Sequence, residues 1–595
     1  MKIKTEFRRW FLPVAILVGL GLMSVIATPV AAQSYPGPFF SISLLAPNTS
    51  TARNQWATLM VEQLPKIGIN VDIFDHTGWA QIGPRTWGHP GPYPIPTYAE
   101  GGYDILFVGN GWGLDFDPTG LFTSDGITPV GDNFYQYASE EMDWVVGNYT
   151  QSFVFAERME YAKDIQAILY EDNPSLCIIY PTSLYPHDVN FEGWNGLLWA
   201  SSYQPMENWS LGSGVEEFHY ATNGDFVDFH PLLFEATYDA EWLHQIYNGL
   251  VERDPLMGNS YQPRILESLS TTDGVTYDCV LKDDLYWADG TPITTEDIEY
   301  NFLLAIDPNL GHSTLSFNEQ YIDEDTVTII NAKEFTLTFL QPYVFQDSNL
   351  ATYLIPKHIW STIDPANHAA QAVTWATSEP EKLIGCGPYK MAEYDGTNSI
   401  IHLTKNEYFD DYWGSEPIID DIYFEYYSNA EGAISALASG QIDLINAQFF
   451  IQPEQLIGVS GITYTLVDDP GNQEMCINME HPYIGNGELL PIAGWESAKK
   501  IRKAISHIIP REIIVEEILG GLGFPGVTHW PKVSLGFDED LPYYEYSIET
   551  ALAYMEAAGY DTTVTTNESG IGLVVVMSIL AFAGASQVFF LKRRK

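Results

Sequence analysis

Positive charge is scarce in this chain. Its 595 residues include 27 lysines and arginines against 78 aspartates and glutamates, a formal net charge of −51 at pH 7. Because binding to phosphate backbones needs clustered lysine and arginine, nucleic acid is excluded as a partner. The acidity indicates a well-solvated surface rather than a cation site, and it disfavours anionic solutes at long range.

Motifs for catalysis and metal binding are also missing. The 13 histidines form no H-x-x-H or H-E-x-x-H pair, and G-x-S-x-G and phosphate-binding glycine loops are absent. Carboxylate pairs such as Asp283-Asp284 and Asp420-Asp421 are expected by chance among so many acids. We therefore expect no catalytic residue, no metal ligand and no cofactor, and do not expect an enzyme.

Cysteine is rare. The four cysteines, Cys177, Cys279, Cys386 and Cys476, lie far apart in the chain and form no C-x-x-C pair, so a zinc site is not expected. Outside the cell they fit either one or two disulfides or buried free thiols.

Apolar runs long enough for a membrane occur at the two ends of the chain. Residues 1–32 combine basic residues, an apolar run and small residues, which predicts a secretory signal cleaved after Ala32; an uncleaved signal anchor is the alternative. Residues 570–591 are apolar and precede the basic residues 592–595. At 1.5 Å per residue this segment is about 33 Å long, enough for one transmembrane helix with a cytoplasmic tail. We expect a single-pass protein of the cell membrane with most of the chain outside.

Glycosylation acceptor tripeptides fit that location. They begin at Asn48, Asn148, Asn208 and Asn567. Each is a weak signal, because such tripeptides also occur by chance.

Between the ends, short β-branched or aromatic segments alternate with amphipathic helical ones, which predicts an α/β fold. Helices are predicted at residues 53–67, 153–170, 497–508 and 550–558, with another starting near 293. Strands are predicted at residues 69–73, 103–108, 176–180, 218–222 and 335–339. Gly68 and Gly559 are expected to end helices, and Thr294 or Thr295 to cap one.

The strongest motif is Trp287-Ala-Asp-Gly-Thr-Pro-Ile-Thr-Thr-Glu-Asp297. It resembles the W-x-D-G-x-P-[IV]-T-A-x-D-[VI] signature of the family 5 extracellular solute-binding proteins, the peptide- and nickel-binding components of ABC importers. Further segments resemble elements of that family in its own order: residues 247–251, 355–358, 385–389, 406–409, 436–443, 501–507 and 551–560.

The order of the chain departs from the family. The signature lies near the start of the mature chain in relatives, whereas here the residues before it resemble the family's final third, at 40–45, 64–73, 103–105, 112–118 and 168–174. This order predicts a circular permutation, which exposed chain termini permit. The alternative is a fusion of two damaged genes, in which each half-domain pairs with another chain.

The resemblance implies a periplasmic-binding-protein-like fold of two lobes (class II, cluster C type), circularly permuted and followed by the transmembrane helix. Residues 190–478 would form the large lobe. Residues 36–178 and 480–563 would together form the lobe that closes on the ligand. The chain would cross between lobes near residues 179–189 and 476–479.

The resemblance also implies a ligand site. Peptide-binding members hold the ligand's α-amino group with an aspartate in a W-x-x-D-[YF]-x-D-P loop, and that role falls on Asp115 here, beside Trp112 and Phe116. The loop is one residue shorter than the common form, and a solvated turn before Pro118 is the alternative. Further ligand-binding candidates flank the lobe junctions: Tyr247, Asn248, Trp375, Tyr389 and Asn478. Trp287 and Asp289 are expected to form a packed turn.

The resemblance thus implies a membrane-anchored extracellular receptor, a monomer that binds peptides between hinged lobes and delivers them to an ABC permease. Nickel chelates and oligosaccharides are alternative solutes within the same family. A sensory or structural surface protein that no longer serves transport remains a second possibility, and a surface hydrolase a third.

Overall fold

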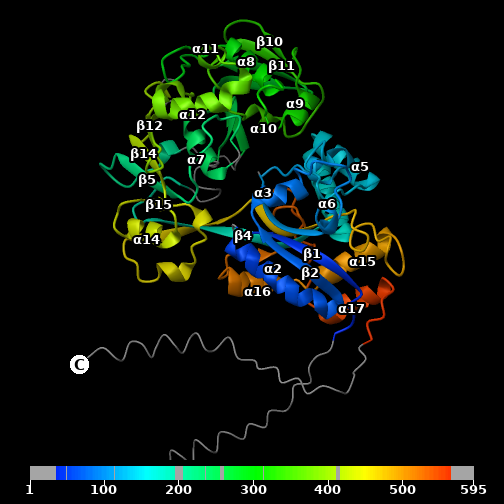
Figure 1. Cartoon of the computed structure of the whole chain (residues 1–595). Coiled ribbons are helices and arrows are strands. Elements are labelled where there is room, and N and C mark those ends of the chain that lie inside the picture. Colours follow the sequence, from blue (N-terminus) through cyan, green and yellow to red (C-terminus); the bar gives the residue numbers. More distant parts are fainter. Residues whose placement is uncertain are drawn as a thin grey trace, which may run out of the picture.

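The computed structural model describes residues 35–563 apart from residues 49, 113, 195–205, 235, 255–259, 313 and 410–415. Figure 1 shows two lobes joined by a long strand, β4. The predicted signal at 1–32, the predicted membrane helix at 570–591 and the tail at 592–595 lie outside the described residues. Within the described part of the chain, no helix has the length and apolarity needed to cross a membrane.

One large sheet runs through both lobes. Its strand order is β12-β13-β14-β5-β15-β4-β17-β3-β1-β2, and β16 and β18 also pair with β4. The strands are β1 (Phe40–Pro47), β2 (Ile69–Thr77), β3 (Ile105–Gly111), β4 (Ser175–Asp188), β5 (Glu217–Thr222), β12 (Tyr389–Asp395), β13 (Ile400–Lys405), β14 (Asp421–Tyr426), β15 (Leu444–Ile445), β16 (Ile462–Asp468), β17 (Gly471–Ile477) and β18 (Gly523–Pro525).

Two smaller sheets lie in one lobe. One has the order β10-β11-β9-β8, and the other pairs β6 with β7. Their strands are β6 (Val251–Asp254), β7 (Ser260–Pro263), β8 (Leu266–Thr271), β9 (Thr276–Leu281), β10 (Val327–Ile329) and β11 (Glu334–Thr338).

Helices pack around the sheets in both lobes (Figure 1). They are α2 (Thr51–Gln63), α3 (Trp79–Ile82), α4 (Thr119–Phe122), α5 (Glu140–Gln151), α6 (Phe155–Asp172), α7 (Thr237–Ile246), α8 (Thr295–Ala305), α9 (Leu315–Tyr321), α10 (Gln346–Leu350), α11 (Lys357–Trp360), α12 (His368–Ser378), α14 (Ala430–Ala438), α15 (Trp495–Ser506), α16 (Arg511–Ile513) and α17 (Ile548–Ala557). The α/β fold class predicted from the sequence is confirmed.

The first lobe is built from two separate stretches of chain, and we call it the composite lobe (residues 35–180 and 471–563). Strand β17 from the second stretch lies between β3 and β4 from the first. The ends of the two stretches also meet, because Phe39 stacks on Tyr560 with ring centroids 4.5 Å apart. Figure 1 shows β1, α2, α15 and α17 together in this lobe.

The large lobe (residues 182–468) follows where β4 crosses the boundary. The first half of β4 pairs with β17, and its second half pairs with β16 over the register Thr182↔Asp468 to Asp188↔Ile462. The chain returns between β16 and β17, at residues 469–470. By this pairing, the predicted lobe boundary at residue 478 shifts to about residue 470, because β17 pairs only within the composite lobe.

Local sequence signals place many of the predicted elements. The side chain of Ser50 caps α2, and Gly68 takes a left-handed conformation (φ 81°) where the chain turns into β2. Thr294 and Asp297 form a capping box at the start of α8. Trp287 is fully buried in the turn before that helix, so the structural role predicted for it is confirmed.

The four cysteine thiols are free and buried. Of the two states left open by the sequence, the structure therefore has free thiols. Burial raises the pKa of both Cys279 and Cys386 to about 12, which keeps these thiols protonated and unreactive at neutral pH.

Candidate ligand-binding cleft

A small cavity lies where the two lobes meet beside the crossing strands. Its volume is about 70 Å³, and residues of both lobes line it. The composite lobe contributes Arg53 and Trp56 from α2, and the large lobe contributes Phe450 and Gln452. Strand β4 forms part of the wall, so a hinge movement at β4 would change the shape of this cavity.

Arg53 is the cation of this cavity. Its Nε donates a hydrogen bond of 2.8 Å to Oε1 of Gln473. Among the described residues, no carboxylate forms an ion pair with its guanidinium. Burial lowers the pKa of Arg53 to about 10, so the side chain stays charged at neutral pH although it is partly desolvated.

The position of Arg53 depends on a glycine in the neighbouring strand. Gln473 of β17 lies opposite Gly109 of β3. A Cβ atom at Gly109 would lie 2.2 Å from Nε2 of Gln473. The absence of a side chain at Gly109 therefore leaves room for the amide that holds Arg53.

Two aromatic side chains complete the cavity. Trp56 is 3% exposed, and its Nε1 has no hydrogen-bond acceptor in the described structure. Phe450 on the opposite lobe is 64% exposed and lines the cavity. A buried indole donor, a desolvated guanidinium and an exposed ring suit a ligand with an acidic group and an apolar part.

The predicted site loop around Asp115 lies at a second contact between the lobes. Oδ2 of Asp115 accepts a 2.8 Å ion-paired hydrogen bond from Nη2 of Arg253 in β6. Trp112 packs edge-on against Phe116, and both rings contact His529 within the composite lobe. Trp112 and Phe116 thus support the loop, and Asp115 faces the large lobe.

Tyr247 and Asn248 lie near this contact. They line a cavity of about 170 Å³ together with His244, Glu252 and Arg253. Of the predicted site residues, Asp115 thus pairs with Arg253, and the buried Tyr247 and Asn248 line a cavity together with it.

The other three predicted site residues lie elsewhere. Trp375 packs in the core of the large lobe against Trp360, with ring centroids 4.8 Å apart. Tyr389 is fully buried in the same core, where its hydroxyl donates to the carbonyl oxygen of Ile419.

Asn478 is buried in the composite lobe. Its Nδ2 donates to backbone carbonyl oxygens, among them that of Tyr103 at 2.9 Å, and its Oδ1 accepts from Gln136. None of the three lines a cavity described here, and their hydrogen bonds and packing explain them structurally.

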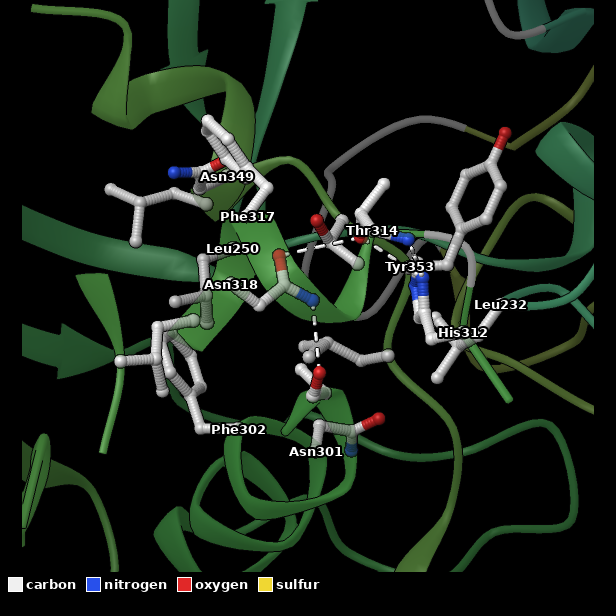
Figure 2. A pocket seen from close by; sticks show the side chains of 15 residues that line it. Leu232, Leu250, Asn301, Phe302, His312, Thr314, Phe317, Asn318, Asn349 and Tyr353 are labelled. Carbon is white, nitrogen blue, oxygen red and sulfur yellow. Dashed lines mark hydrogen bonds between the residues drawn. The ribbon is translucent and has the colours of Figure 1, made fainter. Parts of the chain in front are cut away.

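A third cavity, of about 200 Å³, lies inside the large lobe (Figure 2). Apolar side chains such as Phe302, Phe317 and Leu350 line most of it. Its polar side chains are engaged locally: Asn318 donates to the carbonyl oxygen of Ala305 and accepts from Thr314. Tyr353 lines this cavity and also the one beside Arg253.

Sequence reasoning did not identify Arg53, Trp56 or Arg253 as site residues. For the two arginines the sequence signal is rarity, because a chain of net charge −51 has few basic residues and each of them is a candidate for a structural or binding role. Rarity alone does not distinguish a site cation from buried structural arginines such as Arg502, which donates to three backbone carbonyl oxygens.

Known proteins resemble this chain over part of its length. A family model described as bacterial extracellular solute-binding proteins, family 5 Middle, matches residues 260–582. A Brucella ovis protein named as an ABC transporter peptide-binding protein is 26% identical over 349 residues, covering 58% of this chain and 60% of that protein. The oligopeptide-binding protein OppA of Bacillus subtilis is 24% identical over 345 residues, covering 55% of this chain and 59% of OppA.

The chain thus spans about 60% of the length of these curated relatives. Among solved structures, the oligopeptide-binding protein AppA of Bacillus subtilis in complex with a nonapeptide matches with a TM-score of 0.44. That match has 20% sequence identity and covers 60% of this chain and 66% of AppA.

Proposed function

The chain belongs to the bacterial extracellular solute-binding proteins of family 5, and we propose that it binds peptides between its two lobes and delivers them to an ABC permease. The names of the similar proteins from Brucella and Bacillus, all peptide-binding, support this choice of solute. Such a receptor performs no reaction, in keeping with the lack of catalytic motifs in the sequence. Anchoring by residues 570–591 is part of the proposal.

The cavity around Arg53 is the observation that carries the proposal. It holds a charged guanidinium that forms no ion pair with a described carboxylate, although Asp469 also lines the cavity, and both lobes form its walls. A ligand carboxylate placed there would form a charge-assisted hydrogen bond with Arg53 and could accept another from Nε1 of Trp56. Peptides carry such a carboxylate at their C-terminus.

Asp115 supplies the opposite charge at the same boundary between the lobes. An ammonium group is the natural partner of a carboxylate in a partly desolvated position. We assign the peptide's α-amino group to Asp115, with Tyr247 and Asn248 on the large-lobe side. A ligand with one positive and one negative end matches this pair of side chains.

Native mass spectrometry of the full chain, followed by denaturation, tests the function directly. The expected result is a monomer that releases a mixture of short peptides. Release of a nickel chelate or an oligosaccharide would favour the alternative solutes of the family. A monomer that binds nothing from a peptide mixture would instead favour a structural or sensory role.

The Arg53→Gln substitution tests the carboxylate subsite. Loss of a charge-assisted contact costs about 1.5–3 kcal/mol, so the affinity for peptides with a free C-terminus should fall at least about tenfold. Peptides with an amidated C-terminus should bind both forms about equally.

Isothermal titration calorimetry measures both sets of peptides, and Lys163→Gln is the control. Lys163 is an exposed cation of the composite lobe, 3.9 Å from Asp538. If Arg53→Gln and Lys163→Gln behave alike toward both peptide sets, Arg53 does not contact the ligand.

A further inference from the structure

The carboxylate of Asp115, which the proposed function assigns to the ligand's amino group, has a cationic partner within the chain. Nη2 of Arg253 lies 2.8 Å from Oδ2 of Asp115. The contact is partly shielded from water, since the side chain of Arg253 is 9% exposed and that of Asp115 is 22% exposed. Because the two residues belong to different lobes, the ion pair exists only when the lobes are together.

Arg253 is held in position from its own lobe. It lies in β6 directly opposite Tyr261 of β7. Its guanidinium carbon lies 4.3 Å from the centre of the Tyr261 ring, a cation–π contact. This stacking aims the guanidinium across the boundary and does not depend on Asp115.

Further contacts join the lobes close to this ion pair. Oδ2 of Asp117 accepts a hydrogen bond of 2.5 Å from the hydroxyl of Tyr343. The backbone N–H of Val344 donates to the carbonyl oxygen of Thr150 at 2.9 Å. These contacts place the Asp115 loop and the C-terminal end of α5 against a large-lobe segment that includes Tyr343 and Val344.

A second carboxylate stands near Arg253. Asp347, at the start of α10, has its pKa raised by burial and by the negative charge of Asp115, whereas the charge of Arg253 works in the opposite direction. Asp347 therefore interacts electrostatically with both members of the Arg253–Asp115 ion pair.

We propose that Arg253 determines the ligand selectivity of this site: it competes with the ligand's ammonium group for Asp115, and its ion pair closes the lobes in the absence of a ligand. The choice of an ammonium ligand rests on the proposed function, whereas lobe closure by Arg253 does not. A ligand amine must displace the guanidinium, so weakly held amines are rejected. A displaced Arg253 keeps its stacking contact with Tyr261.

The competition has a quantitative consequence. When a protein populates a state that cannot bind, the apparent dissociation constant rises by the inverse of the competent fraction. If Arg253 occupies Asp115 in nine chains in ten, the carboxylate is available to a ligand amine in only one chain in ten, and removal of Arg253 should tighten binding of amines about tenfold. Ligands with a blocked amino group do not compete for Asp115 and should gain much less.

Lobe closure can be measured without any ligand. Glu141 of α5 and Ile330 after β10 are exposed residues on opposite lobes, and the four native thiols are buried. Cysteines at these two positions can therefore carry a fluorescent pair on the full chain. Arg253→Gln should lengthen the distance between the labels. The control Lys333→Gln, which removes an exposed large-lobe cation paired with Asp283, should leave it unchanged.

Binding is then compared for the same short peptides with free and with acetylated N-termini. Arg253→Gln should bind the free peptides about tenfold tighter than the unaltered chain and the acetylated ones about equally. Weaker binding by Arg253→Gln would make Arg253 a ligand contact and overturn the proposal, as would an unchanged label distance. If no form binds any peptide, the proposed function fails, and the label distance alone still decides whether Arg253 closes the lobes.

Discussion

Glu241 shows how burial shifts the charge state of a side chain. It is fully buried in the large lobe, where its carboxyl accepts hydrogen bonds from Tyr220 and Asn446. No ion pair with Glu241 occurs in the described residues, and burial raises its pKa to about 8. At neutral pH the folded chain therefore holds a proton here that the unfolded chain releases.

The pH dependence follows from that difference. Between the ordinary pKa near 4.5 and the folded-state value near 8, the folded chain binds more protons, so its stability falls as pH rises. Glu241→Gln keeps the group neutral at every pH. We expect this variant to match the unaltered chain at pH 4.5 and to exceed it by about 4 kcal/mol at pH 8.5. Urea unfolding at both values measures this, and equal stability at pH 8.5 would contradict it.

Glu474 is a buried glutamate of the opposite kind. It lies in β17, with Nδ1 of His529 and the hydroxyl of Tyr135 at 2.7 and 2.6 Å. Burial opposes ionisation, yet the charge and hydrogen bond of His529, together with Ser175 and Tyr135, lower the pKa of Glu474 below its ordinary value. Its carboxylate therefore stays charged and holds His529, Tyr135 and Ser175 together in the composite lobe.

The sign of the pH effect is reversed at Glu474. The stabilisation is complete above about pH 4.5 and is lost as pH falls through the lowered folded-state pKa. Glu474→Gln leaves His529 without its carboxylate partner, so we expect the free energy of unfolding to fall by about 3–5 kcal/mol at pH 7. We also expect the stability of the variant to change less with pH below about pH 4.5. Urea unfolding from pH 7 to pH 3 measures both, with the exposed Glu488→Gln as control. If the stability of Glu474→Gln falls as steeply between pH 4.5 and pH 3 as that of the unaltered chain, this role of Glu474 is ruled out.

At the scale of elements, the sequence predicts what local chemistry decides. Helices α6, α15 and α17 lie within about two residues of their predicted bounds, because caps and hydrophobic periodicity are local signals. Helix α2 ends at Gln63, four residues before its predicted end, because residues 64–67 form a 3-10 turn. Strand β4 was predicted as residues 176–180 but runs from Ser175 to Asp188. Its second half pairs with β16, which is nearly 300 residues away in sequence. A pairing over that distance cannot be predicted from the local sequence pattern.

The candidate site divides in the same way. Asp115, Tyr247 and Asn248 follow from family motifs; Asp115 pairs with Arg253, and the other two line a cavity with it. Tyr389 belongs to a family motif and Trp375 is predicted from its place near a lobe junction, but a hydrogen bond to Ile419 and packing against Trp360 make them core residues. Arg253 belongs to no motif, because its role arises only where two lobes meet. Sequence patterns thus find the elements of the site and miss the contacts between them.

At the scale of the whole molecule, the composite lobe unites two stretches that are almost 300 residues apart. Strand β17 pairs with β3 over seven residues and with β4, and α15 packs near α6 in the same lobe. We propose that this arrangement results from circular permutation of a family 5 receptor. In such a chain, both ends leave from the lobe that closes on the ligand, so a membrane anchor would hold that lobe and leave the large lobe free to move.

The composite lobe can be tested by cutting the chain between its two stretches. A protease site is best inserted as additional residues between Gly212 and Gly214, which are exposed; both glycines are kept, because their φ values of 95° and 85° lie in the left-handed region. If β17 and β4 hold the lobe together within one chain, the cut fragments should elute as one species with the mass of a monomer and separate only in denaturant. The control is the chain without the inserted site, treated with the same protease, which should stay uncut. Fragments that separate without denaturant, or a dimer in light scattering, would show instead that the two halves pair between chains.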